Sequence, residues 1–126
     1  MQTLYLIRGI PGSGKTTEAK KIVNETGALH FEADMFFERN GPYKFDPAQI
    51  RAAHQWCQAS TKKALSEGRS VVVSNTFVKQ WEMAAYLNMA TELGVEVNIR
   101  TMNGKYKNVH GVPQDKVKQM AENFEH

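Results

Sequence analysis

Residues 9–16 read Gly9-Ile10-Pro11-Gly12-Ser13-Gly14-Lys15-Thr16, which fits the pattern G-x-x-x-x-G-K-[S/T] at every fixed position. Glycines let the backbone fold tightly enough for several N–H groups to point at one phosphate, and a helix that begins at the loop's end adds partial positive charge. The lysine of this pattern reaches the β- and γ-phosphates, and the hydroxyl after it binds Mg²⁺. The stretch therefore predicts a nucleoside triphosphate site. Its expected ATP-binding residues are Gly12, Ser13, Gly14, Lys15, Thr16 and Thr17, with Thr16 also as the metal ligand.

The segments around this loop alternate between strand and helix patterns. Residues 3–8 form an apolar run typical of a buried strand, and residues 15–26 have helical spacing that ends at Gly27. Further strands are expected at 29–31, 70–74 and 95–100, and further helices at 46–67, at 79–93 and from 113 onward. Strands that alternate with helices argue for crossover connections and a parallel sheet with helices on both faces. The predicted fold class is α/β.

Size and composition limit the function classes. The chain has 126 residues, a formal net charge of +3 and one cysteine. This length fits one domain, 1–126, and the absence of a long apolar run or a secretory signal pattern predicts a cytoplasmic protein without a membrane partner. Because Cys57 is alone, an internal disulfide and a cysteine-based zinc site are excluded, and we expect a buried thiol.

The positive charge is concentrated near the end of the sequence. Residues 97–114 contain no acidic residue, whereas Arg100, Lys105 and Lys107 fall inside this stretch. A net charge this small is compatible with a polyanionic partner and does not establish one.

A second landmark is the run Phe31-Glu32-Ala33-Asp34-Met35-Phe36 after the second predicted strand. It lies at the carboxyl edge of the sheet, where ligands bind in open α/β folds. Asp34 is placed there to take a proton from an acceptor hydroxyl as that oxygen attacks the γ-phosphorus. The spacing also fits an Asp that caps a helix, and Glu32 is a second candidate for the base or for a group near the metal.

With the P-loop, several small motifs occur in an order that resembles the P-loop polynucleotide 5′-kinase family. This family includes the kinase domain of phage polynucleotide kinase and relatives often labelled AAA-family ATPases or zeta-toxin-like kinases, and the likeness runs from Leu4 to about Phe124. The motifs are Phe45-Asp46-Pro47, Ala53-His54-x-Trp56, Ser74-Asn75-Thr76, Trp81-Glu82-Met83 and His110-Gly111-Val112-Pro113.

The resemblance implies a P-loop NTPase-type three-layer sandwich with a small, mostly parallel sheet of four to five strands. It also implies transfer of the γ-phosphate of ATP to a 5′-hydroxyl of DNA or RNA, as in nucleic acid repair, with Mg²⁺ as cofactor. On this resemblance Asp34 is the general base, Lys15 and Thr16 hold the phosphates and the metal, and Asn75 helps to position the acceptor.

The chain departs from the family in its lid and at the acceptor site. The lid is shortened to about residues 101–112, and Lys107 stands where the family has a catalytic Arg, with Lys105 and His110 as further candidates. The residue three after Asp34 is Phe37 rather than the Arg that grips the acceptor phosphate in phage enzymes, so Arg39 is the candidate substitute or else a solvated residue.

Two other function classes stay open at this stage. One is a kinase that acts on a small hydroxyl compound such as a nucleoside, nucleotide, sugar or antibiotic, and the other is a nucleotide-binding protein without transfer activity.

Among the remaining aromatic residues, Phe36, Phe37 and Tyr43 are candidates for core packing or for stacking on a base. Packing roles are expected for Trp81 and Met83, and packing or orienting roles for His54 and Trp56.

Overall fold

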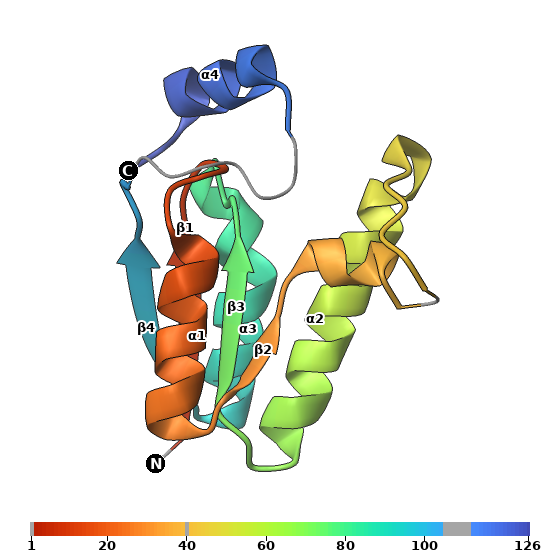
Figure 1. Ribbon diagram of the computed structural model, residues 1–126. Coiled ribbons are helices and arrows are strands. Elements are labelled where there is room, and N and C mark those ends of the chain that lie inside the picture. Colours follow the sequence, from red (N-terminus) through yellow and green to blue (C-terminus); the bar gives the residue numbers. More distant parts are fainter. Residues whose placement is uncertain (1, 40, 105–111) are drawn as a thin grey trace.

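The computed structural model describes residues 2–39, 41–104 and 112–126 and contains a parallel sheet with helices on both faces (Figure 1). Its four strands are β1 (Thr3–Arg8), β2 (Leu29–Phe31), β3 (Val71–Asn75) and β4 (Glu96–Thr101). They lie in the order β2-β3-β1-β4, and every neighbouring pair is parallel. The α/β class and the small parallel sheet are confirmed, with β3 and β4 shifted by one residue from their predicted ranges.

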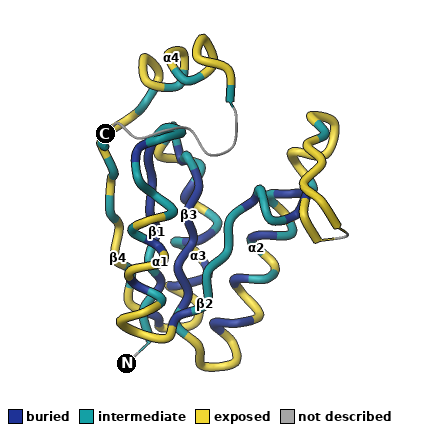
Figure 2. The backbone as a smooth tube through the Cα atoms, viewed as in Figure 1, coloured by how far each residue is buried: buried dark blue, intermediate teal, exposed yellow. Residues whose placement is uncertain are grey.

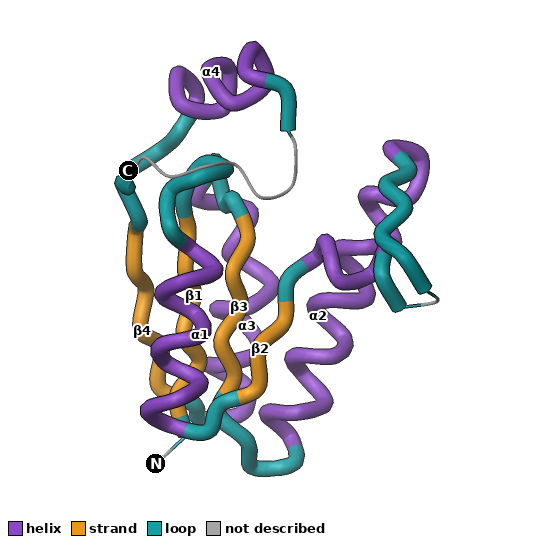
Figure 3. The backbone as a smooth tube through the Cα atoms, in the orientation of Figure 1, coloured by secondary structure: helices purple, strands orange, loops and turns teal. Residues whose placement is uncertain are grey.

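The helices follow the strands as the sequence pattern predicts (Figure 3). The α-helices are α1 (Lys15–Thr26), α2 (Ile50–Ser66), α3 (Ala84–Leu93) and α4 (Gln114–Asn123). Three short 3-10 helices precede or connect them: η1 (Ala33–Phe37), η2 (Pro47–Gln49) and η3 (Gln80–Met83). Asp46 caps η2, since its Oδ1 accepts a hydrogen bond of 3.0 Å from Ala48 N.

The alternation of side chains along the central strands explains the three layers. Leu6 of β1 and Val73 of β3 are register partners on one face, where they pack with residues of α2 and α3. Ile7 and Val72 point to the other face and pack against α1. Because β1 and β3 are covered on both sides, they are buried along most of their length (Figure 2).

One predicted core residue lies at the surface. Met83 is buried, but Trp81 is 74% exposed, so its expected packing role is wrong. Both residues lie in η3, and a 3-10 helix has three residues per turn, so side chains two positions apart point in different directions. Only one of the two can face the sheet.

Other packing predictions hold. Trp56 of α2 makes edge contacts with the rings of Phe31 and Phe36, at centroid distances of 6.1 Å and 6.4 Å. Cys57 is a buried free cysteine, and burial raises the pKa of its thiol. Within the described ranges, no helix combines the length and the apolar character needed to cross a membrane.

Candidate active site

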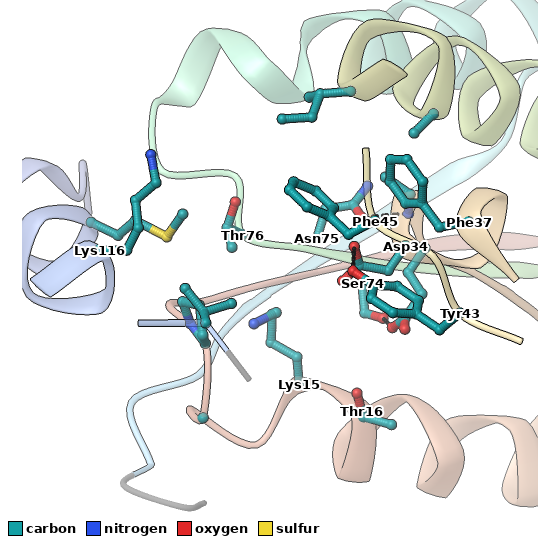
Figure 4. A pocket seen from close by; sticks show the side chains of 18 of the residues that line it. Lys15, Thr16, Asp34, Phe37, Tyr43, Phe45, Ser74, Asn75, Thr76 and Lys116 are labelled. Atoms are coloured by element: carbon teal, nitrogen blue, oxygen red, sulfur yellow. Dashed lines mark hydrogen bonds between the residues drawn. The ribbon is translucent and has the colours of Figure 1, made fainter. Parts of the chain in front are cut away.

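A cavity of about 590 Å³ lies at the carboxyl ends of the strands. Its floor includes the loop between β1 and α1 and the first residues of α1, Lys15 and Thr16, and its wall includes Asp34 of η1 (Figure 4). The aromatic side chains of Phe37, Tyr43 and Phe45 lie at one end of the view, and Lys116 of α4 lies at the other end. Lys15 lies between these two ends. The structure therefore brings the predicted phosphate site and the predicted base into one cavity.

The loop requires glycine for its conformation at Gly14 and for space at Gly9. Gly14 has φ 97°, a left-handed conformation that caps the start of α1. A Cβ atom added at Gly9 would lie 2.3 Å from Ser13 Oγ and 2.9 Å from Met102 O. The Ser13 side chain is fully buried under the loop, whereas Gly12, Gly14, Thr16 and Thr17 line the cavity.

Lys15 lies at the start of α1 with its ammonium group inside the cavity. Its Nζ donates a hydrogen bond of 3.0 Å to Ile10 O. Burial lowers the pKa of Lys15 to about 8, and the nearby carboxylates of Glu32 and Asp34 oppose this shift. Burial therefore disfavours the charged form of Lys15, and an anionic ligand in the cavity would favour it.

Asp34 lies in the first turn of η1, directly beyond β2, where the sequence predicts a base. The hydroxyl of Tyr43 donates to its Oδ1 over 3.4 Å. Burial and the charge of Asp34 together raise the pKa of Tyr43, so the phenol keeps its proton.

The end of β3 fastens the segment that carries Asp34. Asn75 is buried, and its Oδ1 accepts a hydrogen bond of 2.9 Å from Ala33 N, while its Nδ2 donates to Cys57 Sγ over 3.8 Å. The hydroxyl of Ser74 donates to Glu32 Oε2 over 2.8 Å. Since β2 and β3 are parallel neighbours, these two residues meet the chain as it leaves β2.

His30 completes a small cluster beside Glu32. Its Nε2 lies 2.6 Å from Ser74 Oγ and 3.5 Å from Glu32 Oε2. Because Ser74 donates its proton to Glu32, the Ser74 oxygen can accept one from His30. This chain of polar groups orients the Glu32 carboxylate, which lines the cavity close enough to influence the pKa of Lys15.

The donors in the cavity suit a magnesium ion that arrives with a nucleotide. Thr16, Glu32 and Asp34 provide only oxygen atoms, the ligands that Mg²⁺ prefers. No cluster of three or more His, Cys, Asp or Glu residues that could hold a metal occurs in the described part of the chain. Mg²⁺ commonly binds through few protein oxygens together with substrate phosphates, so these residues fit it.

Aromatic side chains form the wall next to Asp34. The ring of Phe37 contacts those of Tyr43 and Phe45, at centroid distances of 6.1 Å and 5.2 Å. Phe37 is buried, but Tyr43 and Phe45 are 40% and 49% exposed, so their rings offer apolar area to a ligand. Ile50, Ala53 and His54 of α2 continue this wall.

Two of the predicted cations that the structure describes, Arg39 and Arg100, do not line the cavity. Arg39 is exposed, and its guanidinium lies 3.6 Å from the centroid of the Phe36 ring and does not line the cavity. Arg100 lies in β4 and forms an ion pair with Glu18 of α1. Lys107, with the other lid candidates Lys105 and His110, lies outside the described residues.

Two residues of α4 that the sequence motifs do not predict also belong to the site. Lys116 and Met120 line the cavity although α4 has no buried residue. Their spacing of four fits one face of the helix, which is the only sequence signal for them.

Comparison with known proteins identifies relatives over nearly the whole chain. The sequence model of the AAA domain family matches residues 4–104. NEDD4-binding protein 2 from Homo sapiens is 31% identical over 134 residues, an alignment that covers 97% of this chain and 8% of that protein. The chain therefore corresponds to a small part of this relative.

Solved structures share the fold at low sequence identity. A chain of the Pnkp1/Rnl/Hen1 RNA repair complex superposes with a TM-score of 0.76 at 17% identity, over 97% of this chain and 43% of that one. A gluconokinase from Sinorhizobium meliloti gives a TM-score of 0.64 at 17% identity, over 98% of this chain and 75% of that one. The fold is that of the P-loop kinases.

Proposed function

Because the chain belongs to the AAA domain family and has a P-loop kinase fold, we propose that it is an ATP-dependent polynucleotide kinase. It transfers the γ-phosphate of ATP to the 5′-hydroxyl of DNA or RNA, and residues 1–126 act as one kinase domain. The observation that carries this proposal is the shared cavity, in which the phosphate-binding loop and Asp34 face each other beside an aromatic wall.

The loop residues form the donor half of the site. The backbone N–H groups of Gly12, Ser13 and Gly14, together with the start of α1 at Lys15–Thr17, bind the phosphates of ATP. The ammonium of Lys15 moves from Ile10 O to the β- and γ-phosphates. Mg²⁺ bound by Thr16 and the phosphates would neutralise charge on the transferred group.

Asp34 forms the acceptor half. The oxygen of the 5′-hydroxyl forms a bond to the γ-phosphorus, the bond from that phosphorus to the bridging oxygen of the β-phosphate breaks, and ADP leaves. The hydroxyl proton passes to the Asp34 carboxylate, which must therefore be ionised before the reaction. Asn75 accepts a hydrogen bond from Ala33 N and so holds the start of η1, the helix that carries Asp34, in position for this proton transfer.

The aromatic wall favours a nucleotide end as the acceptor. Exposed faces of Tyr43 and Phe45 suit a planar base, because stacking on aromatic side chains contributes about 1–3 kcal/mol per base. Arg39 stands outside the cavity and would meet a phosphate further along the strand. Lys107 is proposed as the lid cation on the transferred phosphate, and Lys116 adds a second positive charge at the cavity's other end.

A small hydroxyl compound is the second candidate acceptor. The cavity volume of about 590 Å³ falls within the ordinary range of small-molecule sites, and a gluconokinase shares the fold. A sugar acid would, however, need polar partners on the acceptor side, where Phe37, Tyr43 and Phe45 stand.

A transfer assay with γ-labelled ATP and Mg²⁺ tests the proposal. A single-stranded oligonucleotide with a 5′-hydroxyl should become labelled, and the same oligonucleotide with a 5′-phosphate should not. Nucleosides and gluconate, tested at equal concentration, should accept far less label. Preferential labelling of a small compound would favour the second candidate, and no transfer to any hydroxyl would favour a nucleotide-binding protein without kinase activity.

A further inference from the structure

A buried arginine lies directly before the phosphate-binding loop. Arg8 ends β1 and is only 2% exposed. Burial lowers its pKa, while the charges of Glu125 and Glu82 oppose that shift. An arginine stays protonated even so, and a buried cation requires partners that compensate for its lost hydration.

Backbone carbonyl groups are these partners. The Nε and Nη2 atoms of Arg8 donate to Phe77 O over 3.2 Å and 2.7 Å, and Nη2 also contacts Val78 O at 3.4 Å. Phe77 has φ 44°, an uncommon left-handed conformation for a bulky residue. Backbone strain of this kind persists only where surrounding contacts maintain it, and here the strained residue points its carbonyl at Arg8.

Arg8 also binds the segment that follows α4. Its Nη2 donates to Glu125 O, and its guanidinium carbon lies 4.4 Å from the centroid of the Phe124 ring. The loop after β3 binds the same segment, because Glu125 N donates to Val78 O over 2.7 Å and Gln80 N donates to Glu125 Oε1 over 2.7 Å. Residues 124–126 are therefore attached to the carboxyl edge of the sheet.

This attachment helps to fix where α4 lies. No residue of α4 is buried, yet Lys116 and Met120 line the cavity. Figure 1 shows α4 above the carboxyl ends of the strands, with the chain returning from it toward the sheet. A helix without a buried face gains little hydrophobic stabilisation, so the contacts of residues 124–126 contribute strongly to its position.

We propose that Arg8 is a positioning residue of the nucleotide site. By holding residues 124–126, it keeps α4 over the phosphate-binding loop, where Lys116 contributes positive charge to bound ATP. The effect is on nucleotide binding, so it goes beyond the proposed transfer reaction and does not depend on the acceptor.

The test removes the partners of Arg8 rather than Arg8 itself. A chain that ends at Asn123 should bind ATP about tenfold more weakly, and hydrogen exchange of residues 113–123 should become faster while exchange of β1 and β3 is unchanged. Lys116→Ala should weaken ATP binding in the full chain and have no further effect in the shortened chain. This loss of additivity is the result expected if residues 124–126 act by positioning Lys116.

Two variants of the full chain complete the experiment. Arg8→Lys should weaken ATP binding in the same direction, because an ammonium group cannot reproduce the fork that contacts several carbonyls. Lys118→Ala, on α4 outside the cavity lining, is the matched control and should bind ATP as the unmodified chain does.

An unchanged ATP affinity in the shortened chain would overturn this inference, and so would full additivity with Lys116→Ala. Binding is measured without an acceptor, so neither result depends on polynucleotide transfer. If the unmodified chain binds no ATP, the nucleotide site itself is refuted, and this inference with it.

Discussion

At the scale of single residues, Lys15 determines how the site responds to pH. Burial lowers its pKa to about 8, although Glu32 and Asp34 stand nearby. An ordinary lysine stays charged well above this pH. In the free protein, Lys15 therefore loses its proton in a range where enzymes are commonly assayed, and the phosphates of ATP require the charged form.

We predict that ATP affinity is constant below about pH 7 and falls above about pH 8. Above the pKa of the free protein, ATP binding must be accompanied by proton uptake at Lys15, so affinity should fall by up to about tenfold per pH unit. Calorimetric titration at several pH values measures both the affinity and the proton uptake.

The control for this prediction is Lys15→Arg. A guanidinium group stays charged, so this variant should show a flatter profile even if its affinity is lower. An affinity that is independent of pH between 7 and 9.5 in the unmodified chain would contradict the role given to Lys15.

The sequence predicts the place of a single residue only where neighbouring residues in the chain form a recognisable pattern with it. Lys15 belongs to a contiguous motif, and Asp34 follows a recognisable strand, so both could be placed at the cavity in advance. Lys116 reads as an ordinary exposed helical lysine, because the contacts of residues 124–126 that help to place its helix are distant in sequence. The exposure of Trp81 was not predictable from the sequence, because the side of η3 on which it lies depends on a three-residue turn.

At the scale of elements, the end of β3 holds the start of η1. Asn75 accepts the hydrogen bond of Ala33 N, and Ser74 donates to Glu32. Asp34 is thus carried on a short helix whose first turn is fixed by the neighbouring strand. The position of the base depends on side chains of β3 as well as on its own element.

Asn75→Ala should lower both stability and transfer. It leaves the buried Ala33 N–H without its acceptor, which costs about 1–3 kcal/mol, and it loosens the turn that carries Asp34. ATP affinity should change little, because the phosphate-binding loop keeps its own contacts. Thermal unfolding, ATP titration and transfer rate measure the three effects.

Asn88→Ala provides the matched substitution, since Asn88 is exposed on α3 and does not line the cavity. It should leave all three quantities nearly unchanged. Transfer at the normal rate by a folded Asn75→Ala variant would contradict a supporting role for Asn75.

The central strands β1 and β3 and the first three α-helices were predictable because burial gives them a clear pattern. Val71, Val72 and Val73 form an apolar run of β-branched residues that is typical of a strand covered on both faces. The placement of α4 was not predictable in the same way, because none of its residues is buried. Its position rests on contacts such as that between Arg8 and Glu125, which are distant in sequence.

At the scale of the whole molecule, the cavity has two ends with different chemistry. Lys116 and the phosphate-binding loop provide positive charge at one end, and Tyr43 and Phe45 provide aromatic surface at the other (Figure 4). The positive charge at the aromatic end lies outside the cavity, where Arg39 and nearby lysine and arginine side chains are exposed. This arrangement suits a base inside the cavity and a phosphate chain outside it.

Salt should therefore weaken the binding of an oligonucleotide acceptor. Arg39, Lys44 and Arg51 are exposed in the segment that carries the aromatic wall. Contact of about three cations with a single strand predicts a KM that rises about twentyfold between 50 and 200 mM salt. Arg39→Gln should reduce this salt dependence, and a nucleoside acceptor should show almost none. An oligonucleotide KM that does not respond to salt would contradict contact between the nucleic acid strand and these three cations.

The central claim is that Asp34 accepts the proton of a 5′-hydroxyl while the phosphate-binding loop holds ATP. The most direct measurement compares Asp34→Asn with the unmodified chain in single-turnover transfer to a 5′-hydroxyl oligonucleotide, with ATP affinity measured in parallel. Transfer should fall by about 10²–10⁴-fold, because a general base is lost, while ATP affinity changes less than about threefold. Transfer that persists in Asp34→Asn, or that falls only in step with ATP affinity, would contradict the claim.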